Sequence, residues 1–216
     1  MTNLEKRIAF LSTRNVDIKT VLDIGAHEGN WSRLFQHYFP DANILMIEAN
    51  KDKEEKLKEL GNYKIALLSD TDGKEVDYYK SIDQYTTGNT IYKENNIIST
   101  FVAEKTKTIT LPTLLGSNKG YDLIKMDVQG SELDIIKGAS PIIKDTRFLI
   151  LELGILEYNQ GAPLIGEVIE ELNKLGFVMM DILDFNHSDD TYLIQIDALF
   201  ANKKRIKREE YVTKRR

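Results

Sequence analysis

The sequence contains no cysteine, which excludes disulfide bonds, thiolate nucleophiles and cysteine-ligated zinc sites. Histidine is scarce as well. The three histidines are His27, His37 and His187, and none lies at HxxxH or HExxH spacing from another. This spacing disfavours a histidine-rich metal site. Because a chain without cysteine suits a reducing compartment, we expect a cytoplasmic protein.

Long hydrophobic runs are also missing. No apolar run approaches the ~20 residues that span a bilayer, so the sequence predicts no membrane span. The apolar patch from Ile8 to Leu11 is too short for the core of a signal peptide, and we expect no export signal. Hydrophobic residues make up 42% and charged residues 29% of the chain, a composition typical of soluble globular proteins.

Positive charge is concentrated at the C-terminal end. Residues 203–216 hold eight Lys or Arg and two Glu, although the whole chain has a formal net charge of −5. We interpret this stretch as a solvated basic tail that follows a single domain over residues 1–202. The acidic body is a poor surface for phosphate backbones, so we expect no nucleic-acid partner, although the tail leaves RNA open.

Short apolar runs alternate with helical patterns, which predicts βαβ units and a mostly parallel sheet. The expected strands are residues 20–24, 43–48, 63–68, 121–126 and 147–153, with an antiparallel pair, 177–183 and 192–201, around a loop at 184–190. The expected helices are the opening segment to about residue 14 and residues 30–38, 51–60, 131–137 and 163–175. This order predicts an α/β fold with helices on both faces of the sheet.

An insertion at about residues 70–118 interrupts this alternation. Residues 76–80 and 106–111 have the alternating character of strands, whereas residues 81–100 are rich in Thr, Asn and Tyr and lack a clear period. We expect an inserted loop here that covers a site. Its tyrosines could stack on an acceptor ring or be ordinary strand and loop residues: Tyr78, Tyr79, Tyr85 and Tyr92.

A DxGxxxG loop, from Asp23 to Gly29, follows the first apolar strand and opens a helix. Gly25 permits a sharp turn, and Gly29 lets the helix begin tight against the strand. The helix N-terminus offers free N–H groups to an anionic group of a ligand. His27 replaces the middle glycine of the dinucleotide pattern GxGxxG, which favours a cofactor without phosphates over NAD, the weaker alternative. His27 itself either lines the cofactor pocket or is a polar loop residue.

Two acids accompany this loop. Glu48 ends the second strand, where a carboxylate is placed to accept both ribose hydroxyls of an adenosine ligand. Asp23 could fix the loop by accepting backbone N–H groups, or bind a ligand ammonium through a water. A strand, a glycine loop, a helix and a second strand with a terminal Glu together predict an adenosyl-cofactor site.

At this point the sequence resembles class I S-adenosylmethionine-dependent methyltransferases, and more narrowly the FkbM family. The resemblance covers about residues 19–203. It rests on the following segments: VLDIGAHEGNWS (21–32), IEAN (47–50), IALLSDTDG (65–73), LIKMDVQGSELDIIKGA (123–139) and LILELG (149–154). The resemblance implies a Rossmann-like, seven-stranded, mostly parallel sheet with an antiparallel edge strand, and S-adenosylmethionine bound across the ends of the first two strands.

The same resemblance implies the residues of the cofactor site. Asp23, Gly25 and Gly29 would cradle the methionine part, Glu48 would hold the ribose, and residues 66–70 would pass the adenine. The full expected set is Asp23, Gly25, Ala26, His27, Gly29, Glu48, Ala49, Ala66, Leu67 and Asp127. The chain departs from the family pattern at Gln129, where Glu is usual, and at Leu111-Pro112, where Leu-Asp is frequent. The first departure puts in doubt a charge-based role at position 129.

The expected catalytic residues are acids at strand ends: Asp127, Glu132 and Glu152. A hydroxyl acceptor loses a proton during methyl transfer, which calls for a base or a metal. Glu132 could equally be a first-turn helix acid that serves the helix dipole. Glu152 lies in an apolar strand, where its charge calls for a function or a buried partner such as Lys125. Together these carboxylates could hold Mg²⁺, but we do not favour a metal.

The activity expected from these residues is methyl transfer from S-adenosylmethionine to a hydroxyl of a sugar, glycan or small natural product. Three alternatives stay open: an RNA methyltransferase, a protein or peptide methyltransferase, and a non-catalytic module that binds an adenosyl ligand. A further acidic group lies in the expected loop at 184–190. It consists of Asp184, His187, Asp189 and Asp190, and it is either a polar turn or a weak contact for substrate or metal.

Overall fold

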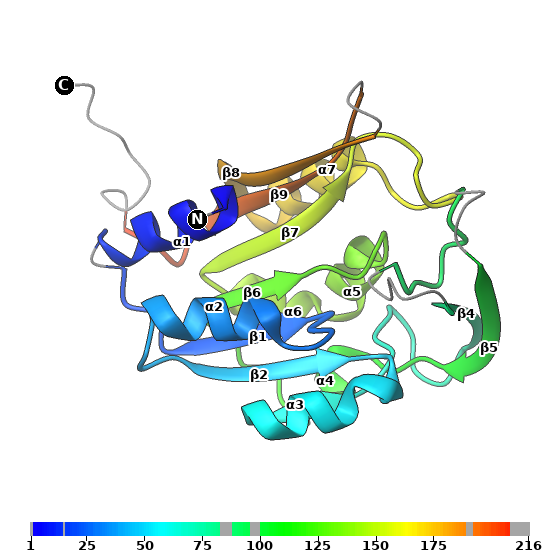
Figure 1. Ribbon diagram of the computed structural model, residues 1–216. Helices are drawn as coiled ribbons and strands as arrows, with labels where there is room; N and C mark the ends of the chain where they lie inside the picture. Colours follow the sequence, from blue (N-terminus) through cyan, green and yellow to red (C-terminus); the bar gives the residue numbers. More distant parts are fainter. Residues whose placement is uncertain (1, 15, 83–87, 96–99, 189–191, 208–216) are drawn as a thin grey trace.

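The computed structural model describes residues 2–14, 16–82, 88–95, 100–188 and 192–207. Its main sheet has seven strands in the order β3-β2-β1-β6-β7-β9-β8 (Figure 1). The strands are β1 (Thr20–Ile24), β2 (Asn43–Glu48), β3 (Tyr63–Ile65), β6 (Leu123–Met126), β7 (Phe148–Gly154), β8 (Phe177–Ser188) and β9 (Tyr192–Asn202). The predicted fold class is confirmed: β9 is antiparallel to both its neighbours, and the pairs from β3 to β7 are parallel.

Helices cover both faces of this sheet (Figure 1). One face carries α1 (Asn3–Ser12), α2 (Asn30–Tyr38), the short η1 (Lys51–Lys53) and α3 (Glu54–Leu60), and the other carries α4 (Leu111–Leu115), α5 (Glu132–Gly138), α6 (Ser140–Asp145) and α7 (Ile165–Leu175). Each face has its own apolar core because successive strand residues point to opposite sides. In β1, Val21 packs with the α1–α3 side, whereas Leu22 packs with the α4–α7 side.

The chain order reverses beside β1, whose neighbours are β2 on one side and β6 on the other. From β1 the chain builds outward to β2 and β3, and then returns to place β6 on the opposite side. In open α/β sheets a crevice forms beyond the carboxyl ends of the strands at such a reversal. The fold therefore places the DxGxxxG loop after β1, the end of β2 and the end of β6 together.

The insertion contains a second, two-stranded sheet. Strands β4 (Glu75–Ser81) and β5 (Phe101–Lys107) pair antiparallel, and Figure 1 shows them beyond the carboxyl ends of the main sheet. The prediction of a strand at residues 106–111 is wrong except at its first two residues, which end β5. Leu111 begins α4, because the Thr110 side chain caps the helix through the Thr113 N–H and Pro112 lies in the first turn, where it is tolerated.

The second half of the chain differs from expectation in three places. Strand β8 continues to Ser188, so Asp184 and His187 belong to a strand rather than to a loop. Asp189, Asp190 and Tyr85 lie outside the described residues. Helix α6 was not predicted. The start of the basic tail packs on the body, because Arg205 pairs with Asp145 and Ile206 is buried.

Among the described residues, no helix has the length and apolar character needed to cross a membrane.

Candidate active site

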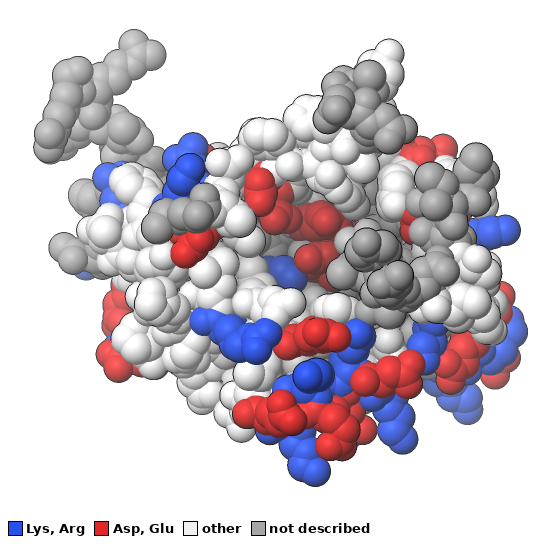
Figure 2. Space-filling view, viewed as in Figure 1, with Lys and Arg blue, Asp and Glu red and all other residues white. Residues whose placement is uncertain are grey.

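A hollow of about 260 Å³ lies beyond the carboxyl ends of β1, β2, β6 and β7. Figure 2 shows this hollow, with acidic side chains inside it. Eight of the predicted site residues line it: Gly25, His27, Glu48, Ala49, Ala66, Leu67, Asp127 and Glu152. Four others do not line it: Asp23, Ala26, Gly29 and Glu132. The fold therefore gathers most of the predicted residues from five separate segments.

The turn after β1 brings the backbone of the first strand against the end of β6. Gly25 has φ +78, and a Cβ added there would lie 1.9 Å from the backbone oxygen of Asp127. The N–H groups of Gly25 and Ala26 both donate to the Ile47 carbonyl, at 2.9 and 3.1 Å. Only glycine combines this positive φ with so close an approach of two backbones.

Glu48 closes the opposite side of the turn. Its two oxygens accept the N–H groups of His27 and Asn50, each at 2.7 Å. Burial raises the pKa of Glu48, and these backbone hydrogen bonds partly offset that rise. Each carboxylate oxygen can accept a second hydrogen bond. Glu48 therefore holds the loop and still offers acceptors to ligand hydroxyls in the hollow.

Asp23 lies under the turn, on the α2 side of the sheet. It is fully buried, accepts the Ser32 hydroxyl at 2.6 Å and lies 3.5 Å from the Lys125 ammonium. In β1 its side chain alternates with Leu22 and Ile24 and faces α2, so it accepts the Ser32 hydroxyl in place of the predicted backbone N–H groups. It supports the floor of the hollow.

Gly29 also acts away from the hollow. It begins α2 with φ +72, and a Cβ there would lie 2.3 Å from the side chain of Leu60 and 3.2 Å from that of Met46. Glycine therefore lets α2 start close to β2 and α3, as the sequence indicated. His27 is half-buried with φ 50, and burial, followed by the nearby Lys53 charge, lowers its pKa.

Lys125 is the buried cation beneath the site. Its ammonium lies 3.1 Å from Asp127 and 3.5 Å from Asp23, and 5.9 Å from the centre of the Trp31 ring. Burial would lower the pKa of Lys125, but the two carboxylates outweigh it and raise the pKa above its usual value. The suggestion that Lys125 pairs with Glu152 is wrong, since this lysine is held by the two aspartates.

Asp127 and Glu152 meet at the floor of the hollow through Gln129. The Gln129 amide nitrogen donates to Asp127 at 3.0 Å and to Glu152 at 2.5 Å, and Gln195 donates to Glu152 at 3.2 Å. Burial would raise the pKa of Asp127, but Lys125 and these hydrogen bonds hold it below its usual value. Burial and then the Asp127 charge raise the pKa of Glu152 well above its usual value.

Glu132 faces the protein rather than the hollow. Its oxygens accept the N–H groups of Val128 and Gly130 at 2.9 and 3.0 Å, and the residue is 4% exposed. It therefore clasps the loop between β6 and α5, so the structural role is the one that the geometry supports. Burial raises the pKa of Glu132 from 4.5 to about 7, despite these hydrogen bonds.

This clasp carries a testable expectation. In Glu132→Gln one acceptor becomes an NH₂ donor that faces a buried N–H group, and we expect the free energy of unfolding to fall by about 1–3 kcal/mol. Since the folded protein holds the Glu132 proton more tightly, wild-type stability should decrease as the pH rises from about 4.5 to about 7, and the variant should lack this component. Urea unfolding at pH 5 and pH 8 measures both effects. Equal stability of the two proteins at both pH values would contradict the clasp.

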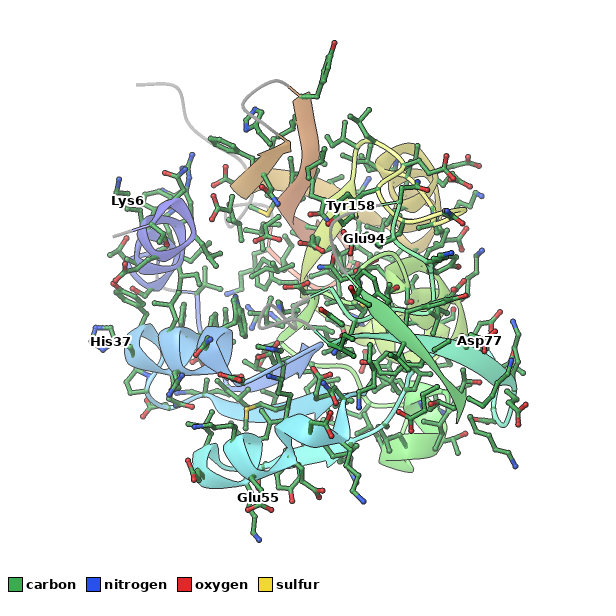
Figure 3. The ribbon with its side chains drawn as sticks, turned by 45° about the vertical axis from the view of Figure 1, so that its right-hand side comes forward. Lys6, His37, Glu55, Asp77, Glu94 and Tyr158 are labelled. Carbon is green, nitrogen blue, oxygen red and sulfur yellow. The ribbon has the colours of Figure 1, made fainter. Side chains whose placement is uncertain are left out.

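A segment of the insertion, residues 89–95, covers one side of the hollow, and we call it the covering segment. Thr90 donates to the Gln129 carbonyl at 2.8 Å, and Tyr92 donates to Asp134 at 2.7 Å. At its far end Glu94 accepts the hydroxyl of Tyr158, and Figure 3 shows these two side chains next to each other. The start of the covering segment therefore lines the hollow, and the expectation that the insertion covers a site stays a prediction.

Several lining residues were missed by the sequence analysis. They are polar and come from the covering segment, β8 and β9: Asn89, Thr90, Asn186 and Gln195. Of the tyrosines considered, Tyr78 lines the hollow, whereas Tyr79 and Tyr92 lie beside a separate surface pocket. Asn186 faces the hollow from β8, whereas Asp184 and His187, the residues of β8 considered as substrate contacts, do not line it. Periodicity gave no signal for these residues.

No group of three or more His, Asp or Glu side chains in the described part of the chain is arranged to hold a metal ion. Asp127 and Glu152 share the floor, but Glu132 is turned into the β6–α5 loop.

Comparison with known proteins decides the family. The family model described as "Methyltransferase FkbM domain" matches residues 23–179. This chain belongs to the FkbM methyltransferase family. The match spans the DxGxxxG loop, the insertion, the Asp127 loop and β7, so every segment of the hollow except β9 and the end of β8 falls within it.

One curated relative and two solved structures are similar to this FkbM protein. It is 24% identical over 178 residues to "2-O-methyltransferase NoeI" of Sinorhizobium fredii, covering 73% of this chain and 72% of the relative. An S-adenosylmethionine-dependent methyltransferase from Clostridium acetobutylicum has a TM-score of 0.53 at 11% identity, covering 92% of this chain and 90% of that one. TrmK of M. capricolum, in complex with S-adenosylhomocysteine, has a TM-score of 0.51 at 7% identity, covering 91% and 68%. The two structures show the fold alone.

The residues of the hollow fit S-adenosylmethionine. Ile47, Ala66, Leu67 and Leu68 give an apolar wall for a base, and Glu48 offers acceptors for ribose hydroxyls beside it. The turn at Gly25 and the polar side chains at the β6 end suit the amino-acid part. The protein is accordingly an S-adenosylmethionine-dependent methyltransferase of the FkbM family.

Proposed function

We propose that this enzyme methylates a hydroxyl oxygen of a sugar, glycan or small natural product, with Glu152 as the base. The observation that carries the proposal is the position of Glu152. It lines the hollow, no cation lies within ion-pairing distance of it among the described residues, and two amide groups hold it in place. A carboxylate with a raised pKa in a substrate cavity suits proton transfer near neutral pH.

S-adenosylmethionine supplies a methyl group that is already activated, so the chain has two remaining tasks. It must hold the acceptor in line with the methyl group, and it must take the hydroxyl proton. Glu152 is the group suited to the second task. Asp127 is less suited because the Lys125 ammonium keeps it ionised and weakly basic. For the first task the amides of Asn186 and Gln195 can each both donate to and accept from a hydroxyl.

Two further observations support the proposed class of acceptor. NoeI, the curated relative, is described as a 2-O-methyltransferase. The hollow itself contains acidic side chains (Figure 2), and its lining includes Glu48, Asp127 and Glu152. This charge disfavours a polyanionic acceptor such as RNA. A neutral, hydroxyl-rich acceptor avoids this repulsion and matches the amides.

Mass spectrometry of candidate acceptors tests the proposal. The purified protein would be incubated with S-adenosylmethionine and separate pools of monosaccharides, glycans, hydroxylated natural products, peptides and RNA. We expect a gain of one methyl group in a hydroxyl-bearing pool, located on oxygen by fragmentation. A methyl group found on nitrogen, or in RNA alone, would refute the proposal, while retained binding of S-adenosylhomocysteine would show that the protein is folded.

A further inference from the structure

Gln129 occupies a backbone conformation that side-chain-bearing residues rarely adopt. Its φ is +55, and it follows Asp127 and Val128 directly after β6. Such a conformation costs of order 1–3 kcal/mol and persists only when its surroundings fix it. Here the Gln129 carbonyl accepts the Thr90 hydroxyl at 2.8 Å and the Asn159 amide at 2.7 Å. These donors come from the covering segment and from the loop before α7, so two separate segments fix one peptide.

The side chain of Gln129 connects two carboxyl groups. An amide nitrogen carries two hydrogens, and this one donates to Asp127 at 3.0 Å and to Glu152 at 2.5 Å. The opposite orientation of the amide would turn its oxygen toward the ionised Asp127, where repulsion disfavours it. Neither a hydroxyl nor a carboxylate could donate to both groups at once.

We propose that Gln129 is a positioning residue that ties Asp127 and Glu152 into one hydrogen-bonded pair, in which Asp127 remains with Lys125 and Glu152 takes up the proton. This inference rests on the proposed function in the role that it gives to Glu152. The bridge from Gln129 to Asp127 and Glu152 involves only residues of this chain and is independent of the acceptor. The positive φ of Gln129 directs its side-chain amide between the end of β6 and β7.

The charges around the pair explain why a neutral bridge matters. Glu152 faces Asp127, Glu132 and Asp197 as like charges and Lys125 as the opposite charge, whereas Asp127 contacts Lys125 directly. Ionised Glu152 therefore adds a negative charge to an acidic floor. The Gln129 amide stabilises the ionised forms of both carboxyl groups through its two hydrogens. A carboxylate at position 129 would remove that stabilisation from both groups and add repulsion.

Carbon-13 NMR of the carboxyl groups tests the bridge without any acceptor. Asp and Glu carboxyl carbons would be labelled and titrated in the wild type and in Gln129→Glu, each saturated with S-adenosylhomocysteine. We expect the variant to raise the apparent pKa values of both Asp127 and Glu152 by about one unit or more. Gln195→Glu is the matched control, because Gln195 donates to Glu152 and to the Gln129 oxygen but not to Asp127, and it should shift the pKa of Glu152 more than that of Asp127.

A second variant guards against misfolding. Gln129→Met keeps the length of the side chain but has neither donors nor charge, so it should raise both pKa values by less than Gln129→Glu does. Unchanged titration of Asp127 in both variants, or equal shifts of the pair in Gln195→Glu, would overturn the bridge. Where an acceptor is found, the acid limb of kcat should move to higher pH in Gln129→Glu, while the KM for S-adenosylmethionine stays within about twofold. A wild type that methylates no hydroxyl would refute the proposed function, and the NMR result would still decide the bridge.

Discussion

Replacement of Glu152 by glutamine should lower kcat for methyl transfer by about 10²- to 10⁴-fold, the range typical of a lost general base. The change preserves the size of the side chain and its place between Gln129 and Gln195, but it removes the site that accepts the proton. Since the base must be ionised to act, the wild-type rate should rise as the pH increases through the raised pKa of Glu152. The variant should lose this dependence. Initial rates with a fixed acceptor between pH 5 and pH 9 measure both quantities.

Binding measurements separate loss of the base from loss of the site. The affinity of Glu152→Gln for S-adenosylhomocysteine, measured by calorimetry, should stay within about threefold of the wild type, because the apolar wall and Glu48 are untouched. Glu170→Gln on α7 is a control for the loss of one charge, since that side chain is 72% exposed. Full activity of Glu152→Gln would show that Glu152 is not the base and would leave Asp127 as the next candidate.

Replacement of Gly25 by alanine should abolish cofactor binding and destabilise the fold. The added Cβ would lie 1.9 Å from the Asp127 carbonyl oxygen, so the turn after β1 and the end of β6 would have to separate. We expect the free energy of unfolding to fall by about 3 kcal/mol or more. The affinity for S-adenosylhomocysteine should fall by at least about 100-fold, since both separated segments line the hollow. Urea unfolding and calorimetry provide the two measurements.

Gly73 offers a matched control for this substitution. Its φ of +73 is close to the +78 of Gly25, but no atom lies within 4 Å of the position that a Cβ would take. Gly73→Ala should therefore cost only the backbone strain, about 1–2 kcal/mol, and leave cofactor affinity unchanged. Similar losses for the two variants would show that φ alone, rather than the approach to Asp127, makes Gly25 necessary.

The sequence predicted the elements around the proposed cofactor half of the hollow well because their signals are local. An apolar strand, a glycine loop and a helix follow one another within Thr20–Tyr38, and the structure places β1 and α2 at the predicted residues. Strand β2 with its terminal Glu48 was equally clear. These elements need only their own apolar periods and one turn to be recognised, and the parallel order then brings them together.

The acceptor half was harder to predict because its contacts join distant segments. Asn186 reaches the hollow because β8 continues past residue 183, where its apolar pattern ends. Gln195 lay inside the predicted strand at 192–201, but the pattern did not show that it faces the hollow. Glu132 was a candidate catalytic acid because it follows a strand end in the first turn of a helix, yet its side chain accepts the N–H groups of Val128 and Gly130. Side-chain direction at a loop depends on φ values, such as those of Gln129 and Gly130, that the sequence pattern does not contain.

The small sheet of β4 and β5 has a consequence for how acceptor preference could diverge. Its strands hydrogen-bond to each other in unbroken register over Glu75–Ser81 and Phe101–Lys107, and neither pairs with a strand of the main sheet. Because this two-stranded sheet pairs only with itself, its strands and their connection can change in length or sequence while the main sheet keeps its geometry. Relatives with the same cofactor chemistry could then be retuned for new alcohols by exchange of this one hairpin.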